Sequence, residues 1–165
     1  MTHLNVGDKA PTISGLDQSG QSVTFDRFAG QSIVLYFYPK DDTPGCTAEA
    51  CSLRDGYQDL LDSGYAVVGV SPDSVAKHGK FVDKFDLPFP LIADVDKAVI
   101  KAYGVWGLKK FMGREFEGVH RLTFVIDVDR CISRIITKVK TKESAAQILE
   151  SAVWSQLKLR LWGRW

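Results

Sequence analysis

The chain has 165 residues, of which 45 % are hydrophobic and 25 % are charged, a composition typical of one globular domain. Its formal net charge of +1 gives no electrostatic reason to expect a nucleic-acid partner. The longest nearly apolar run, residues 33–38, is too short to span a bilayer, and the first residues lack the pattern of a secretory signal. Three cysteines cannot close into a complete set of disulfides, so we expect a reducing, cytoplasmic location.

The hydrophobic pattern predicts strands that alternate with helices, followed by a late strand hairpin. The expected strands are a small hairpin around the turn at 15–21, then residues 33–38, 65–70, 91–93, 122–127 and 132–139. The expected helices cover residues 47–62, 75–85, 95–103 and 142–155, with Ser74 as the N-cap of the second. This order is typical of an α/β fold with a mixed central sheet, flanking helices and an N-terminal β-hairpin.

One cysteine stands where the first long helix is expected to begin. Cys46 follows a buried strand and the proline-flanked loop of residues 39–45. Free N–H groups and the positive dipole end at a helix start stabilise a thiolate, the reactive form of cysteine. A buried, inert cysteine is the common alternative. The loop favours reactivity, because Pro44 stiffens it, Thr43 supplies a hydroxyl, and Gly45 lets the backbone approach a small substrate.

The pattern Pro39-x-x-x-Thr43-x-x-Cys46 resembles the active-site motif of the peroxiredoxins. The longer run Tyr-Pro-Lys-Asp-Asp-Thr-Pro-Gly-Cys-Thr-Ala-Glu-Ala-Cys, which ends at Cys51, is similar to the bacterioferritin comigratory protein or peroxiredoxin Q branch. Residues 70–74, 87–91 and 102–107 also resemble this branch. The resemblance extends over roughly residues 6–150. It implies a thioredoxin-like fold, a thiol-dependent peroxidase activity and no cofactor.

This resemblance implies a role for each residue of the motif. Cys46 would be the peroxidatic cysteine, whose thiolate attacks H2O2 or an organic hydroperoxide and becomes a sulfenic acid. Thr43 would hydrogen-bond the peroxide and the sulfur, while Pro39 and Pro44 would shield the sulfur from water. Arg121 would supply the cation that stabilises the thiolate and the developing oxyanion. Without the resemblance, Arg121 would be interpreted as a solvated charge at a strand end.

Two positions depart from the family pattern. Leu122 stands where a small polar residue is expected, and the turn Asp127-Val-Asp-Arg-Cys131 lacks the usual glycine. These departures concern the local turn rather than the chemistry.

The resemblance also implies that Cys51 resolves the sulfenic acid by forming an intramolecular disulfide with Cys46, which thioredoxin or a similar dithiol then reduces. Five residues of ideal helix separate two Cα atoms by roughly 8.6 Å, whereas a disulfide usually needs less than about 7 Å. We therefore expect a continuous helix in the reduced protein and unwinding of its first one or two turns on oxidation. The alternative for Cys51 is a small packed residue.

The remaining candidates carry no expected chemistry. Cys131 begins an expected strand and is interpreted as an ordinary thiol. Three histidines, His3, His78 and His120, have no metal-ligand spacing with the cysteines, so no metal site is expected. Glu49, three residues after Cys46, is interpreted as structural.

Residues 151–165 are expected to extend beyond a domain of residues 1–150. They hold three of the four tryptophans, with Lys158, Arg160 and Arg164 and no acid. This segment is interpreted as a helix extension or a loosely ordered tail, with contact to a membrane surface or a partner as the alternative. By resemblance, we expect a monomer.

Two other functions use cysteine chemistry. A disulfide oxidoreductase of the thioredoxin type normally carries Cys-x-x-Cys, whereas the spacing here is Cys-x-x-x-x-Cys. A redox sensor or chaperone would use the same switch between Cys46 and Cys51, and only its rates would differ from those of a peroxidase.

Overall fold

The computed structural model describes residues 2–150 and 161. The predicted C-terminal extension, residues 151–165, therefore lies outside the described residues except for Leu161. The same holds for the end of the last predicted helix, of which residues 144–150 are helical after a 3-10 turn at Thr141–Glu143. Among the described residues, no helix has the length and apolar character needed to cross a membrane.

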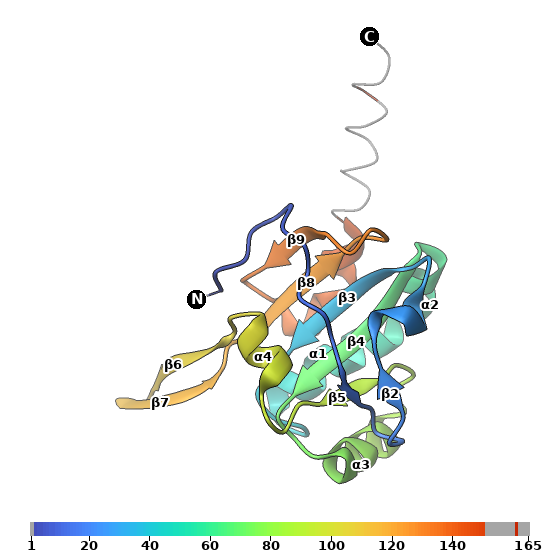
Figure 1. Ribbon diagram of the computed structural model, residues 1–165. Helices are drawn as coiled ribbons and strands as arrows, with labels where there is room; N and C mark the ends of the chain where they lie inside the picture. Colours follow the sequence, from blue (N-terminus) through green and yellow to red (C-terminus); the bar gives the residue numbers. More distant parts are fainter. Residues whose placement is uncertain (1, 151–160, 162–165) are drawn as a thin grey trace.

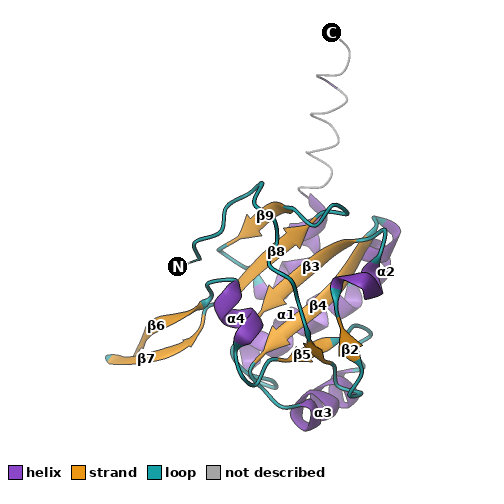
Figure 2. Cartoon of the chain, viewed as in Figure 1, coloured by secondary structure: helices purple, strands orange, loops and turns teal. Residues whose placement is uncertain are grey.

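A mixed five-stranded sheet forms the centre of the domain (Figures 1 and 2), with the strand order β5-β4-β3-β8-β9. The strands are β3 (Ser32–Phe37), β4 (Tyr65–Ser71), β5 (Leu91–Ala93), β8 (Leu122–Ile126) and β9 (Ile132–Ile136). β3, β4 and β5 are parallel, while β8 is antiparallel to β3 and to β9. β3 is central and buried on both faces, as its continuous apolar run predicts. The predicted mixed sheet is confirmed.

Helices cover both faces of this sheet. The labelled helices are α1 (Pro44–Asp55), α2 (Tyr57–Asp62), α3 (Val75–Phe85) and α4 (Ala98–Ala102), with a 3-10 turn at Phe25–Phe28. The first three contribute to one apolar cluster, and α4 contributes to the cluster on the opposite face. Alternate residues of β3 enter the two clusters, because successive side chains of a strand point to opposite faces. The predicted bounds of α3 and its Ser74 N-cap are confirmed.

The single helix predicted over residues 47–62 is wrong in two respects. It begins earlier, at Pro44, and it is divided into α1 and α2 at Gly56. A Cβ atom on Gly56 would lie only 2.5 Å from the Cβ of Ala145, so the glycine lets the last described helix pack directly against this junction.

Two small hairpins lie outside the central sheet. The predicted N-terminal hairpin is confirmed as β1 (Gly15–Leu16) and β2 (Ser22–Val23). The second, β6 (Trp106–Phe111) paired with β7 (Arg114–Val119), was not predicted and extends away from the body of the domain (Figure 1). Its strands are mostly exposed, so they lack the regular burial pattern that marks a strand in a sequence. The turn, with Gly113 at φ +78°, provides the only local signal.

The turn between β8 and β9 forms without a glycine. Arg130 adopts the left-handed region at φ +64°, which is uncommon for a residue with a side chain. Its guanidinium donates to the carbonyls of Gln31 at 2.7 Å and Phe28 at 2.8 Å, and these bonds hold the conformation. Leu122, the other departure from the family pattern, is 1 % exposed and belongs to the apolar core.

Candidate active site

The loop between β3 and α1 places Cys46 in the first turn of a helix. Thr43 is extended (φ −95°, ψ 156°), and its carbonyl accepts the N–H of Thr47 at 2.8 Å. Pro44 is the first helical residue, where its missing N–H costs nothing. Cys46 is 1 % exposed and packs in the apolar cluster beneath α1. The sulfur is therefore sheltered from water and close to the positive end of the helix dipole.

The sheet register brings Arg121 to this sulfur across 75 residues of sequence. Phe37 at the end of β3 is paired with Leu122 at the start of β8. Because these strands are antiparallel, the residue before Leu122 lies beside the loop that follows Phe37. The Nη2 of Arg121 donates to Cys46 Sγ at 3.0 Å. The structure thus brings together the two residues that the resemblance assigned to the chemistry.

Gly45 provides room for this guanidinium. A Cβ atom at position 45 would lie 3.3 Å from Arg121 Nη2, tighter than an ordinary van der Waals contact. The lack of a side chain therefore serves the approach of Arg121, in addition to the expected approach of a substrate.

Glu49 is a member of the site that sequence reasoning interpreted only as structural. It is completely buried, and its Oε2 accepts a hydrogen bond from Arg121 Nη1. Burial raises the pKa of Glu49 to about 7, although the charge and hydrogen bond of Arg121 act in the opposite direction. Its second oxygen, Oε1, has no hydrogen-bond partner among the described residues. The spacing of three residues from Cys46, which shares a helix face, is the signal that could have found it.

One guanidinium therefore serves two acidic groups. Arg121 is a permanent cation held between the Cys46 thiol and the Glu49 carboxyl. If both groups ionised, two buried negative charges would share one positive charge, which low dielectric makes unfavourable. Cys46 and Glu49 therefore share a single guanidinium as their charged hydrogen-bond donor.

The β6–β7 hairpin places a second cation near the site. Lys109 on β6 donates to the carbonyl of Val119 at 3.0 Å. Burial and the neighbouring charge of Arg121 lower the pKa of Lys109, while the charge on Cys46 acts in the opposite direction. Sequence reasoning missed this residue because it missed the hairpin.

The other residues of the motif have different surroundings. Thr43 Oγ1 donates to the carbonyl of Lys40 at 3.0 Å and does not cap the helix. This bond uses the hydroxyl hydrogen and leaves the oxygen lone pairs available to accept. Pro39 is half-buried, whereas Pro44 is exposed.

The second cysteine of α1 is separated from the first. Both are free, and α1 is continuous through Cys51, as expected for the reduced protein. Cys46 lies in the apolar cluster beneath the helix, whereas Cys51 is half-buried and outside it. Cys131 is also free and half-buried. It precedes β9 at the end of β8 that pairs with Ile33, so it lies toward the opposite end of the sheet from Arg121.

Comparison with known proteins agrees with this geometry. Residues 6–135 match the AhpC/TSA family. The chain is 43 % identical over 148 residues to peroxiredoxin Bcp of Bacillus subtilis, covering 90 % of this chain and 94 % of that protein. It is 44 % identical over 141 residues to peroxiredoxin Bcp of Escherichia coli K12, covering 86 % and 90 % of the two chains.

A solved structure shows the same fold. A mutant of the peroxiredoxin PrxQ of Xylella fastidiosa superimposes with a TM-score of 0.87 at 29 % identity, covering 94 % of this chain and 99 % of that one. The fold is therefore the thioredoxin-like fold of the peroxiredoxins, as the resemblance implied. The chain belongs to the AhpC/TSA family and, within it, to the Bcp or PrxQ peroxiredoxins, which are thiol peroxidases.

Proposed function

We propose that this peroxiredoxin uses Cys46 as its peroxidatic cysteine and Cys51 as its resolving cysteine, with thioredoxin or a similar dithiol as the reductant. The observation that carries the proposal is the contact of 3.0 Å between Arg121 Nη2 and the buried Cys46 Sγ at the start of α1. A fixed cation and a helix start together favour a thiolate and the negative charge that develops on the peroxide oxygen.

In the first step, the Cys46 thiolate attacks one peroxide oxygen and the O–O bond breaks. The sulfur becomes a sulfenic acid, and the leaving hydroxide or alkoxide takes a proton to become water or an alcohol. Arg121 stabilises the charge as it moves from sulfur to the leaving oxygen. Because the Thr43 hydroxyl donates to Lys40, Thr43 Oγ1 is free to accept a hydrogen bond from the peroxide O–H.

In the second step, the Cys51 thiolate attacks the sulfenic sulfur and expels its oxygen as water after protonation, which leaves a disulfide. The reductant then exchanges its two thiols for this disulfide and is itself oxidised. The intact helix separates the two cysteines, so the first turns of α1 must unwind before the disulfide forms.

A relative supports peroxides as substrates. A solved structure of the Xanthomonas campestris bacterioferritin comigratory protein, 30 % identical with a TM-score of 0.79, concerns its alkyl peroxide reduction activity. We extend this substrate class to the present chain, together with hydrogen peroxide. From the family resemblance we also infer a monomer, and the odd number of cysteines supports a reducing compartment such as the cytoplasm.

The proposed activity can be tested by peroxide-dependent oxidation of NADPH in the presence of thioredoxin and thioredoxin reductase. The wild-type chain should turn over continuously, the Cys46→Ser variant should have no activity, and the Cys131→Ser variant should match the wild type. Continued turnover by Cys46→Ser would contradict the assignment of the peroxidatic cysteine. Oxidation without turnover would instead indicate a sensor that uses the same switch.

A further inference from the structure

A second group of buried polar side chains lies behind the loop that carries the active-site motif. Asp41, Asp73 and His78 are all buried, and their possible ligand atoms lie within 4.8 Å of one another. None of them belongs to the site around Cys46 and Arg121. His78 is completely buried on α3, a position that a spacing argument from the cysteines could not reveal.

The hydrogen-bond partners of His78 determine which of its ring nitrogens carry a hydrogen. Its Nε2 lies 3.0 Å from the carbonyl oxygen of Ile92, which can only accept, so Nε2 carries a hydrogen. Its Nδ1 lies 2.6 Å from Asp41 Oδ2. A carboxylate and a bare ring nitrogen would repel at this distance, so a proton lies between them.

The surroundings of Asp41 indicate where that proton resides. The Tyr38 hydroxyl lies 2.6 Å from Asp41 Oδ1. Burial and the charges of Tyr36 and Asp41 raise the pKa of Tyr38, which therefore stays protonated and donates this bond. With donors at both of its oxygens, Asp41 is best matched as a carboxylate, and His78 as the imidazolium that faces it.

Asp41, Asp73 and His78 also connect the loop of residues 39–45 to the rest of the domain. The Asp41 N–H donates to Asp73 Oδ2 at 2.7 Å, and Asp73 Oδ2 also accepts from the Ser71 hydroxyl at 3.0 Å. Asp41 is therefore held by its side chain to α3 and by its backbone to the end of β4. The next residue, Asp42, adopts a left-handed φ of +58°, a conformation that needs support from its neighbours.

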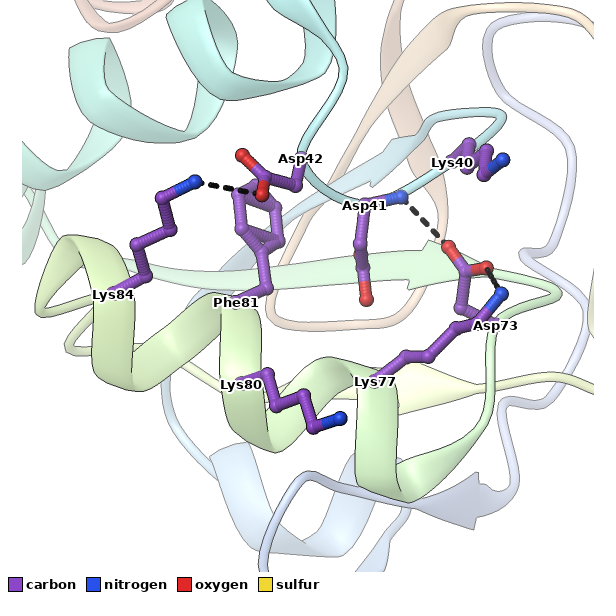
Figure 3. A pocket seen from close by; sticks show the side chains of 8 residues that line it. All are labelled: Lys40, Asp41, Asp42, Asp73, Lys77, Lys80, Phe81 and Lys84. Carbon is purple, nitrogen blue, oxygen red and sulfur yellow. Dashed lines mark hydrogen bonds and ion pairs between the residues drawn. The ribbon is translucent and has the colours of Figure 1, made fainter.

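On the solvent side, lysines lie around Asp41 and its neighbour Asp73. Figure 3 shows Lys77 directed at Asp73, with a distance of 3.8 Å between Lys77 Nζ and Asp73 Oδ1. The adjacent cavity of about 220 Å³ is lined by Asp41, Asp42, Asp73, Phe81 and four lysines, Lys40, Lys77, Lys80 and Lys84. From the sheet side, β5 contributes the carbonyl of Ile92 and β3 leads into Tyr38. A metal ion would have to replace the proton between His78 and Asp41 and would lie among these cations, so the geometry favours the proton.

We propose that His78 is a positioning residue for the peroxidatic step: its imidazolium, paired with Asp41, fixes the loop of residues 39–45 and thereby the start of α1. This inference rests on the proposed function of Cys46. Asp41 is five residues before Cys46, and the loop between them carries Thr43 and the room for Arg121 at Gly45. A small displacement of this segment would disturb the approach of the peroxide to the sulfur.

The test compares the full-length wild type with His78→Gln, Asp41→Asn and the double variant, and uses His3→Gln at an exposed histidine as the control. Single-turnover oxidation of Cys46 by H2O2 should slow about 10- to 100-fold in both single variants. The double variant should be no slower than the slower single variant, because both substitutions remove the same interaction. An unchanged rate in folded His78→Gln, or additive losses, would overturn the proposal.

A spectroscopic readout separates positioning from a general loss of structure. In the reduced wild type, nitrogen NMR of labelled histidine should show both ring nitrogens of His78 protonated at neutral pH. The same signature should be present in His3→Gln. A neutral ring at neutral pH, or a stoichiometric bound metal, would contradict the proposal even if His78→Gln did not fold.

Failure of the proposed function would give a different result. If the wild type did not react with peroxide, the rate of Cys46 alkylation by iodoacetamide would still report on the position of the loop. It should differ between the wild type and Asp41→Asn if the pair fixes the loop. Equal alkylation rates would overturn the positioning role independently of peroxidase activity.

Discussion

Cys46 and Cys51 are five residues apart on one helix, yet their surroundings are opposite. Cys46 is 1 % exposed, packs against the core and accepts a hydrogen bond from Arg121. Cys51 is half-buried and lies outside that cluster. The first thiol lies in an environment that favours reaction with peroxide, whereas in the proposed cycle the second can reach it only after the helix opens. The comparison teaches that the proposed cycle places two conflicting demands on α1. The helix must be intact to hold the Cys46 thiolate, and it must open for Cys51 to form the disulfide.

The strongest way to separate the two thiols is the Cys51→Ser variant. Its Cys46 should be oxidised by H2O2 at the wild-type rate, because the environment of this thiol is intact. Continuous turnover with thioredoxin should fall more than about 100-fold, since no internal disulfide forms. Stopped-flow oxidation and the NADPH-coupled assay measure the two steps separately. Equal turnover of this variant and the wild type would remove Cys51 from the proposed cycle.

The Arg121→Lys variant removes the hydrogen-bonding geometry of the guanidinium at Cys46 but keeps a positive charge at position 121. A lysine is a point charge and lacks the rigid fork that reaches Cys46 and Glu49 together. We expect the oxidation rate of Cys46 to fall by roughly 100- to 1,000-fold, the usual effect of losing an oriented oxyanion donor. The matched control is Arg114→Lys at an exposed position of β7, which should keep the wild-type rate. A fully active Arg121→Lys would show that charge alone is sufficient.

A substitution at Gly45 should disturb the position of Arg121 to a smaller extent. In Gly45→Ala, the new methyl group would meet Arg121 Nη2 at 3.3 Å and displace the guanidinium by a few tenths of an ångström. The oxidation rate should fall about 10-fold, since the oriented donor is misplaced but still present. Gly79→Ala is the matched control, because φ is not positive there and the atom nearest to the added Cβ is the Gln18 carbonyl oxygen at an ordinary 3.8 Å. No loss of rate in Gly45→Ala would show that Arg121 tolerates the displacement.

The burial of Glu49 in the Cys46 site predicts a pH dependence of the stability of the fold. Folding raises the pKa of Glu49 from 4.5 to about 7, so the folded state binds this proton more tightly than the unfolded state. The contribution is full below pH 4.5 and is lost as the pH rises toward 7, a decrease on the order of 3 kcal/mol.

Glu49→Gln should remove this slope, and the exposed Glu115→Gln should retain it. Urea unfolding of the reduced proteins at several pH values measures the effect. A slope that survives in Glu49→Gln would assign it to another group.

The smallest expected effect concerns the opening of α1. Ala48 lies between the two cysteines, and Ala48→Gly lowers helix stability by about 1 kcal/mol. Because opening precedes resolution, disulfide formation should accelerate by up to about 5-fold, while the first oxidation changes little. Mass spectrometry after rapid quenching measures the disulfide. A slower disulfide step in Ala48→Gly would contradict the opening mechanism.

The sequence predicts the parts of this molecule that depend on local pattern. The central strands and α3 follow from continuous apolar runs and from a capping serine, both of which act within a few residues. The break at Gly56 depends on contact with Ala145, and the exposed β6–β7 hairpin has little burial to reveal it.

The residues of the site also fall into those that a local pattern reveals and those that only the folded chain reveals. Cys46 was found from its helix start, and Arg121 only from a family resemblance, because its approach depends on the pairing of β3 with β8. Glu49 and His78 are polar residues that helical patterns place by default in water. Their burial depends on the folded domain, and no local sequence pattern predicts it.

The junction at Gly56 sets a boundary for motion during the cycle. The last described helix packs against this junction at Ala145, at the C-terminal end of α1. In the proposed cycle, unwinding that starts near Cys46 can therefore extend through at most the 12 residues of α1 before it reaches this packed junction. In that cycle, the segment that unwinds and refolds is confined to α1, while α2 and the sheet keep their positions.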